Sequence, residues 1–114
     1  MSEPVIWHNP RCSKSRQTLA ILEEAGFTPV IVRYLEVSPD VAELRVALEL
    51  LDFAASDLIR SGESLYKDLG LKGQPDDVLI EAMVANPILI ERPVVFHNGK
   101  ASLGRPPESV LGIL

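Results

Sequence analysis

Residues 5–32 read VIWHNPRCSKSRQTLAILEEAGFTPVIV and predict a strand, a helix and a second strand. Val5-Ile6-Trp7 is a short, continuous apolar run that is typical of a buried strand. Apolar side chains recur at helical spacing from Ser15 to Ala25, and Gly26 favours the end of that helix. Val30-Ile31-Val32 is β-branched and predicts the next strand. We therefore expect a βαβ unit at the start of the chain.

A helical segment is predicted to follow, over about residues 38–86. Ser38 is expected to be the N-cap of its first helix, with Pro39 at the first helical position. The pattern weakens over residues 52–74, which indicates short helical pieces broken by glycines. Residues 75–77, Pro-Asp-Asp, are typical of the start of another helix.

A β-hairpin is predicted where Asn98-Gly99 separates the apolar runs 93–96 and 101–103, because Asn-Gly between two such runs favours a tight turn. A last short helix is expected from Pro106 to Leu114. This order of elements predicts the α/β class, with a thioredoxin-like mixed four-stranded sheet and a helical insert. With 114 residues, the chain fits a single domain over 1–114.

Composition limits the classes of partner. The net charge of -5 argues against a general nucleic-acid role, since proteins that bind phosphate backbones are usually basic. The start at residues 1–4 is polar and the apolar run after it is too short for a signal peptide or a membrane span. We expect a cytoplasmic monomer that binds neither nucleic acid nor a membrane.

Cys12 is the only cysteine, and it lies where the first strand ends and the first helix begins. His8, Arg11, Lys14 and Arg16 flank it, and cations together with a helix N-terminus favour the thiolate. The simpler alternative is a small buried side chain without chemistry. Because the only thiol coincides with this run of cations, we interpret Cys12 as a catalytic nucleophile. One cysteine cannot form an internal disulfide, so a thiol from outside must reset any oxidation of Cys12.

Two familiar cysteine motifs are absent from this segment. A Cys-x-x-Cys dithiol would need a second cysteine where the chain has Ser15. A phosphatase loop with five residues between cysteine and arginine would need arginine where the chain has Thr18. A single-thiol nucleophile in a turn that favours anions remains.

Arg60, Arg92 and Arg105 each lie at a break in the pattern, and the last two precede prolines. A residue before proline favours an extended backbone, so Arg92 and Arg105 should project from strand ends. Guanidinium groups hold tetrahedral oxyanions well, although each arginine taken singly is more simply a surface or ion-pair residue. His97, beside the hairpin turn, is expected to be solvent-exposed. We see no metal-ligand pattern and expect neither a metal nor a tightly bound cofactor.

Several separated motifs together resemble the glutaredoxin-dependent arsenate reductase family, in its short, housekeeping-type branch. The motifs are His8-Asn9-Pro10-x-Cys12 with Ser15-Arg16, Tyr34-Leu35-Glu36, Asn86-Pro87-Ile88-Leu89-Ile90-Glu91-Arg92-Pro93 and Gly104-Arg105-Pro106. The resemblance covers essentially the whole chain. It implies a thioredoxin-like fold and a cis peptide bond before Pro93.

The resemblance also implies roles for residues. It makes Cys12 the nucleophile and His8 the residue that lowers its pKa, although His8 could instead be a satisfied polar residue at the strand end. It implies that the arsenate oxyanion is bound by four residues: Arg60, Arg92, Arg105 and Ser15. The implied reaction forms a covalent thiol–arsenate on Cys12, uses glutathione as co-substrate to release arsenite, and relies on glutaredoxin to remove the mixed disulfide.

Two other functions stay open. The resemblance extends to small regulators that bind RNA polymerase and sense disulfide stress through Cys-x-x-Cys. Because Ser15 replaces the second cysteine, the alternative here is a polymerase-binding regulator without catalytic activity. A monothiol reductase acting on glutathione adducts ranks last, since no glutathione-binding motif is evident.

Overall fold

The computed structural model describes residues 3–114, so the first two residues of the polar start lie outside the described part. The chain forms two compact units. One, called the sheet unit here, comprises residues 3–37 and 92–114, and the other, the helical unit, is Ser38–Glu91. The helical unit contains the predicted insert, about residues 38–86, and extends to Glu91. The assignment of both units to a single domain stays a prediction. No helix within residues 3–114 is long and apolar enough to cross a membrane.

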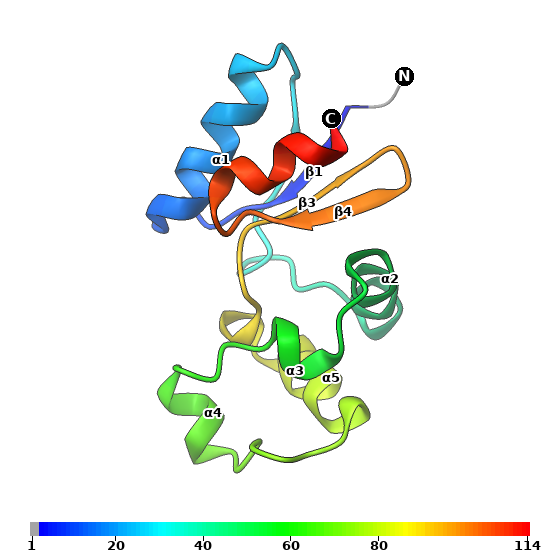
Figure 1. Ribbon diagram of the computed structural model, residues 1–114. Coiled ribbons are helices and arrows are strands. Elements are labelled where there is room, and N and C mark those ends of the chain that lie inside the picture. Colours follow the sequence, from blue (N-terminus) through cyan, green and yellow to red (C-terminus); the bar gives the residue numbers. More distant parts are fainter. Residues whose placement is uncertain (1–2) are drawn as a thin grey trace. The chain divides into compact units, whose positions relative to one another are not determined.

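The sheet unit is built on four strands in the order β2-β1-β3-β4. Their bounds are β1 Val5–Trp7, β2 Val30–Val32, β3 Val94–His97 and β4 Lys100–Leu103. β1 pairs parallel with β2 and antiparallel with β3, which pairs antiparallel with β4 (Figure 1). The predicted α/β class with a thioredoxin-like mixed four-stranded sheet is confirmed.

Two helices cover one face of this sheet. α1 (Ser13–Glu24) and the 3-10 helix η2 (Pro107–Ile113) pack against each other, and η2 also contacts β4 (Figure 1). Apolar side chains from both helices and two strands form a fully buried cluster of Ile6, Leu22, Val95 and Val110. Each such side chain contributes roughly 1.5–3 kcal/mol when it leaves water. The cluster therefore holds α1, and the residue that precedes it, in place on the sheet.

The Asn98-Gly99 turn closes the hairpin as predicted. Both residues have positive φ, 52° and 72°, which is the backbone geometry of the tight turns that match the twist of paired strands. The pairing of Val94 with Leu103 sets the register toward the open end.

The prediction that His97 is solvent-exposed is wrong. The residue is 5% exposed, and its Nδ1 lies 2.9 Å from the carbonyl oxygen of Ile113. The ring of Phe27 lies against its imidazole with centroids 5.1 Å apart. Groups distant in the sequence therefore cover a residue that sits next to a turn.

The helical unit contains α2 (Val41–Leu51), α3 (Ala55–Leu58), α4 (Ser64–Asp68), α5 (Asp76–Ala85) and the 3-10 helix η1 (Pro87–Leu89). Its buried apolar side chains, where α2 and α3 pack on α5, include Leu44, Leu48, Leu58, Ile80 and Met83. The short, interrupted pieces expected between residues 52 and 74 are α3 and α4.

The prediction of Ser38 as N-cap of α2 is wrong, because Asp40 has that role. The Asp40 carboxylate accepts the backbone N–H of Glu43 at 2.8 Å, and the Glu43 carboxylate accepts the N–H of Asp40 at 3.1 Å. This reciprocal pair satisfies two helix-end donors at once, which one hydroxyl cannot do. Ser38 instead donates its hydroxyl to the carbonyl of Val84 at 2.8 Å.

Gly104 follows β4 at a point of close approach. Its N–H donates to the carbonyl of Pro93 at 2.9 Å. A Cβ at this position would lie 2.5 Å from Thr18 Oγ1 and 2.7 Å from Pro93 Cγ. Only glycine fits here without displacing α1 or the segment before β3.

Gly104→Ala is therefore expected to lower the free energy of unfolding by about 1–3 kcal/mol, the usual cost of forcing an extra carbon into a packed site. Urea denaturation of the purified variant measures this. Gly112→Ala is the control in the same unit, since a Cβ there meets nothing within 4 Å. Equal stabilities of the two variants would contradict the packing argument.

Candidate functional site

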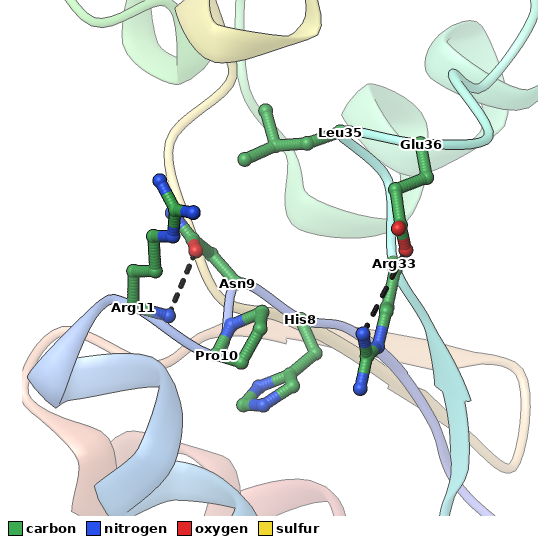
Figure 2. A pocket seen from close by; sticks show the side chains of 7 residues that line it. All are labelled: His8, Asn9, Pro10, Arg11, Arg33, Leu35 and Glu36. Atoms are coloured by element: carbon green, nitrogen blue, oxygen red, sulfur yellow. Dashed lines mark hydrogen bonds and ion pairs between the residues drawn. The ribbon is translucent and has the colours of Figure 1, made fainter.

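The loop between β1 and α1 places Cys12 at the N-terminus of a twelve-residue helix. His8 extends the pairing of β1 by donating its N–H to the carbonyl of Val32 at 2.8 Å. Asn9 then folds the loop: its side-chain oxygen accepts the N–H of Arg11 at 3.0 Å, and its carbonyl accepts the N–H of Cys12 at 3.0 Å (Figure 2). Cys12 is thereby the N-cap of α1, with its thiol beside the first free backbone N–H groups.

The surroundings of the thiol lower its pKa. Burial raises the pKa of Cys12, a residue that is 9% exposed, but other groups outweigh this effect. The backbone N–H of Ser15 and the charge of Arg92 are the strongest of these, followed by the N–H of Lys14 and the charge of Arg105. The net result is a pKa below the ordinary thiol value, which favours the thiolate nucleophile.

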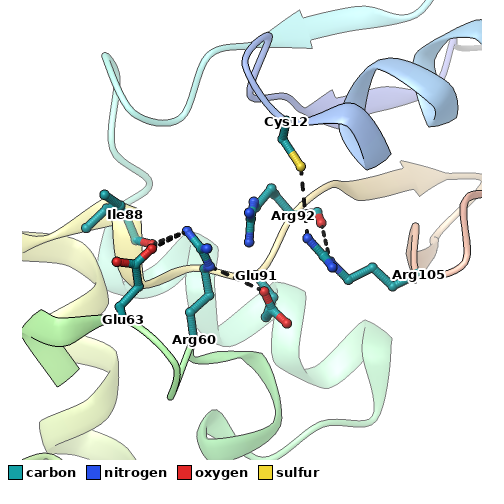
Figure 3. Close-up of polar contacts among 7 residues, drawn as sticks. All are labelled: Cys12, Arg60, Glu63, Ile88, Glu91, Arg92 and Arg105. Atoms are coloured by element: carbon teal, nitrogen blue, oxygen red, sulfur yellow. Dashed lines mark hydrogen bonds and ion pairs between the residues drawn. The ribbon is translucent and has the colours of Figure 1, made fainter. Parts of the chain in front are cut away.

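Arg92 and Arg105 meet because of the hairpin register. Arg92 lies two residues before Val94 and Arg105 lies two residues after Leu103, so the pairing of Val94 with Leu103 brings both arginines to the open end of the hairpin. The Nε–H of Arg105 donates to the carbonyl of Arg92 at 2.9 Å, and its Nη2 lies 3.9 Å from Cys12 Sγ (Figure 3). The predicted cis bond at Arg92–Pro93 is confirmed, and Arg105–Pro106 is a second cis bond that the sequence reading missed.

The cations next to Cys12 in the sequence have a different place. Arg11, Lys14 and Arg16 are exposed, and Arg16 donates from Nη1 to the carbonyl of Pro10 at 2.9 Å. The charges that lower the pKa of the thiol come from Arg92 and Arg105. Proximity in the sequence correctly predicted a cationic environment for the thiol, but it did not identify the side chains that supply the charge.

His8 and Ser15 are joined inside the loop. His8 Nδ1 lies 2.6 Å from Ser15 Oγ, which also accepts the N–H of Asn9 at 3.0 Å. Burial lowers the pKa of His8, and the charges of Arg33 and Arg16 lower it further. A neutral imidazole fits this arrangement, with Nδ1 accepting the Ser15 hydroxyl proton. The hydroxyl of Ser15 is thus engaged within the loop, whereas its backbone N–H acts on the thiol.

Arg60 belongs to the helical unit. Its backbone N–H donates to the carbonyl of Leu89 at 2.7 Å, beside an isolated antiparallel bridge between Ile59 and Ile90. Its guanidinium pairs with Glu63 at 2.7 Å and with Glu91 at 3.6 Å (Figure 3). Two carboxylates therefore orient Arg60 within its own unit. Among residues 3–114, no group of three or more histidine, cysteine or acidic side chains could hold a metal ion.

The comparisons with known proteins agree with this architecture. The ArsC family model matches residues 7–113. The chain belongs to the ArsC family. The Escherichia coli K12 protein YfgD, named as uncharacterized, is 53% identical over 96% of this chain and 94% of its own length.

Further relatives of the family carry a named activity. An arsenate reductase of Neisseria meningitidis serogroup A is 44% identical, with both chains covered completely. The solved structure named arsenate reductase from Vibrio cholerae is 50% identical and superposes with a TM-score of 0.94 over 97% of each chain.

Arg105→Gln is expected to raise the pKa of Cys12, because it removes a fixed positive charge near the thiolate. The rate of alkylation by iodoacetamide, measured from pH 5 to 9, reports the thiolate fraction. Lys14→Gln is the matched control, since it removes an exposed cation closer in sequence and keeps the backbone N–H. Equal shifts in the two variants would show that the position of the charge does not matter.

The lowered pKa of His8 predicts a pH-dependent stability. As pH falls through the ordinary histidine pKa of about 6.5, His8 becomes protonated in the unfolded chain but stays neutral in the folded chain. The free energy of unfolding therefore decreases. Urea denaturation between pH 8 and 5.5 should show a smaller loss in His8→Gln than in the unmodified chain. Parallel pH profiles would contradict this explanation. His97 is present in both proteins and does not affect the comparison.

Proposed function

We propose that this ArsC-family chain is a cytoplasmic oxidoreductase that reduces arsenate to arsenite, with glutathione and glutaredoxin as the reductants. The observation that carries the proposal is the Cys12 thiol at the N-terminus of α1, with a lowered pKa and the Arg105 guanidinium 3.9 Å from its sulfur. A nucleophile beside a guanidinium suits a tetrahedral oxyanion as the electrophile. The arsenate reductases named among its relatives support arsenic as the central atom of that oxyanion.

The first step is attack of the Cys12 thiolate on arsenic. A sulfur–arsenic bond forms, an arsenic–oxygen bond breaks, and the oxygen leaves as water after it takes up protons. Arsenic stays pentavalent in this thiol–arsenate. Backbone N–H groups at the start of α1 and the charges of Arg92 and Arg105 offset the negative charge of the oxyanion.

The second step uses an outside thiol, because the chain has a single cysteine. Glutathione attacks the adduct, a disulfide forms between its sulfur and Cys12, and arsenic keeps the electron pair of the broken bond. Arsenic is thereby reduced from pentavalent to trivalent while two thiols are oxidised. A glutaredoxin thiol then exchanges with the mixed disulfide and returns Cys12 to the thiolate.

Residues of the loop and of the helical unit have supporting roles in this proposal. His8 holds Ser15, whose backbone N–H lowers the pKa of the thiol, so His8 is a positioning residue. Arg60 is assigned to the oxyanion on the family resemblance, and its guanidinium pairs with Glu63 and Glu91 within the helical unit.

Cys12→Ser should abolish arsenite formation and leave the fold intact, since a serine hydroxyl is isosteric but far less acidic than a thiol. Arsenite is measured with purified protein, arsenate, glutathione and glutaredoxin, and the thermal midpoint of both proteins is the control for folding. Turnover retained in the variant would refute the nucleophile. A lack of turnover in the unmodified chain would refute arsenate as the substrate.

A further inference from the structure

A pocket lies beside the Cys12 loop and is separate from Arg92 and Arg105. Seven residues of the sheet unit line it, and we call it the side pocket: His8, Asn9, Pro10, Arg11, Arg33, Leu35 and Glu36 (Figure 2). Its walls are the segments that follow β1 and β2. These strands are parallel neighbours, so their carboxyl ends lie at the same edge of the sheet. Such an edge is where open α/β sheets commonly bind ligands.

The arrangement of charged side chains in the side pocket restricts which ligands it can bind. The guanidinium groups of Arg11 and Arg33 lie on opposite sides of it, and the Glu36 carboxylate lies beside Arg33 (Figure 2). Arg33 and Glu36 are 3.9 Å apart with side chains 60% and 67% exposed, so their mutual ion pair is weak and both can pair with a ligand. Pro10 and the exposed Leu35 add apolar surface between the charges.

This pattern fits a small zwitterion with a carboxylate at each end. An α-ammonium next to an α-carboxylate would complement Glu36 next to Arg33, and a second carboxylate would reach Arg11. Guanidinium groups bind carboxylates through paired hydrogen bonds, which makes arginine suited to both positions. Glutathione has these groups: a zwitterionic γ-glutamyl end, a glycine carboxylate and a thiol between them.

The position of the pocket connects it with the chemistry of Cys12. Residues 8–11 form one wall and lead directly into Cys12. A chain with one cysteine needs a second thiol delivered to that point. We propose that the side pocket is the glutathione subsite, with Arg33 and Glu36 holding the γ-glutamyl end and Arg11 the glycine carboxylate; this rests on the proposed function for its catalytic meaning.

Binding can be tested without any turnover by using S-methylglutathione, whose sulfur cannot react. Calorimetry on the full chain should detect binding, and Arg33→Ala should weaken it by about tenfold or more, the effect of losing a charge-assisted hydrogen bond. Arg45→Ala is the matched control, because Arg45 is also exposed and pairs with a carboxylate, Asp77, in the helical unit. Absence of binding, or equal weakening by the two variants, would overturn the proposal.

A truncated ligand tests the orientation. S-methyl-cysteinylglycine lacks the γ-glutamyl end, so its binding should respond to Arg11→Ala and not to Arg33→Ala. The reverse result would overturn the assignment of the two ends.

Steady-state kinetics tests the glutathione subsite separately from the proposed reductase function. In the arsenate assay, Arg33→Ala should raise the KM for glutathione and leave both the KM for arsenate and the alkylation rate of Cys12 unchanged. An unchanged KM for glutathione would overturn the subsite while the reductase function stood. If the unmodified chain reduced no arsenate, the proposed reductase function would be refuted. The binding of S-methylglutathione would then still test whether the side pocket is a glutathione subsite.

Discussion

The pairing of β1 with β3 is the constraint on which the candidate site depends. Trp7 pairs with Val94, so the carboxyl end of β1 lies next to the start of β3. The chain leaves β1 toward Cys12 at this edge, and it enters β3 from Arg92 at the same edge. A register shift of one residue would reverse the faces of every side chain on the strand and separate the thiol from its cations.

The electrostatic balance at Cys12 follows from this geometry. Burial alone would raise the pKa of the thiol, and it is overcome by backbone N–H groups and two arginines that the fold holds in place. Guanidinium groups stay charged throughout the neutral range, whereas the buried His8 is held neutral. The thiolate is therefore stabilised by fixed dipoles and permanent charges, and the imidazole serves to hold Ser15 in the loop.

Most of the fold was predictable because its elements are encoded by local patterns. The four strands, the Asn98-Gly99 turn and the start of α5 depend on residues adjacent in sequence. The predictions were wrong where two neighbouring residues could serve as the same helix cap, and where residues distant in the sequence determine whether a side chain is buried. Asp40 prevails over Ser38 as N-cap because Glu43 can complete a reciprocal pair with it. His97 is buried because Phe27 and Ile113 cover it, which no pattern around the turn indicates.

By itself the sequence determined that Cys12 is the only thiol, that an outside thiol must serve any redox cycle, and that the hairpin turns at Asn98-Gly99. The hairpin built on that turn pairs Val94 with Leu103 and so brings Arg92 and Arg105 to its open end. Only the tertiary structure decided that this open hairpin end faces Cys12. The two residues in contact, Cys12 and Arg105, are 93 positions apart, and their meeting depends on a long-range strand pairing that local preference does not encode.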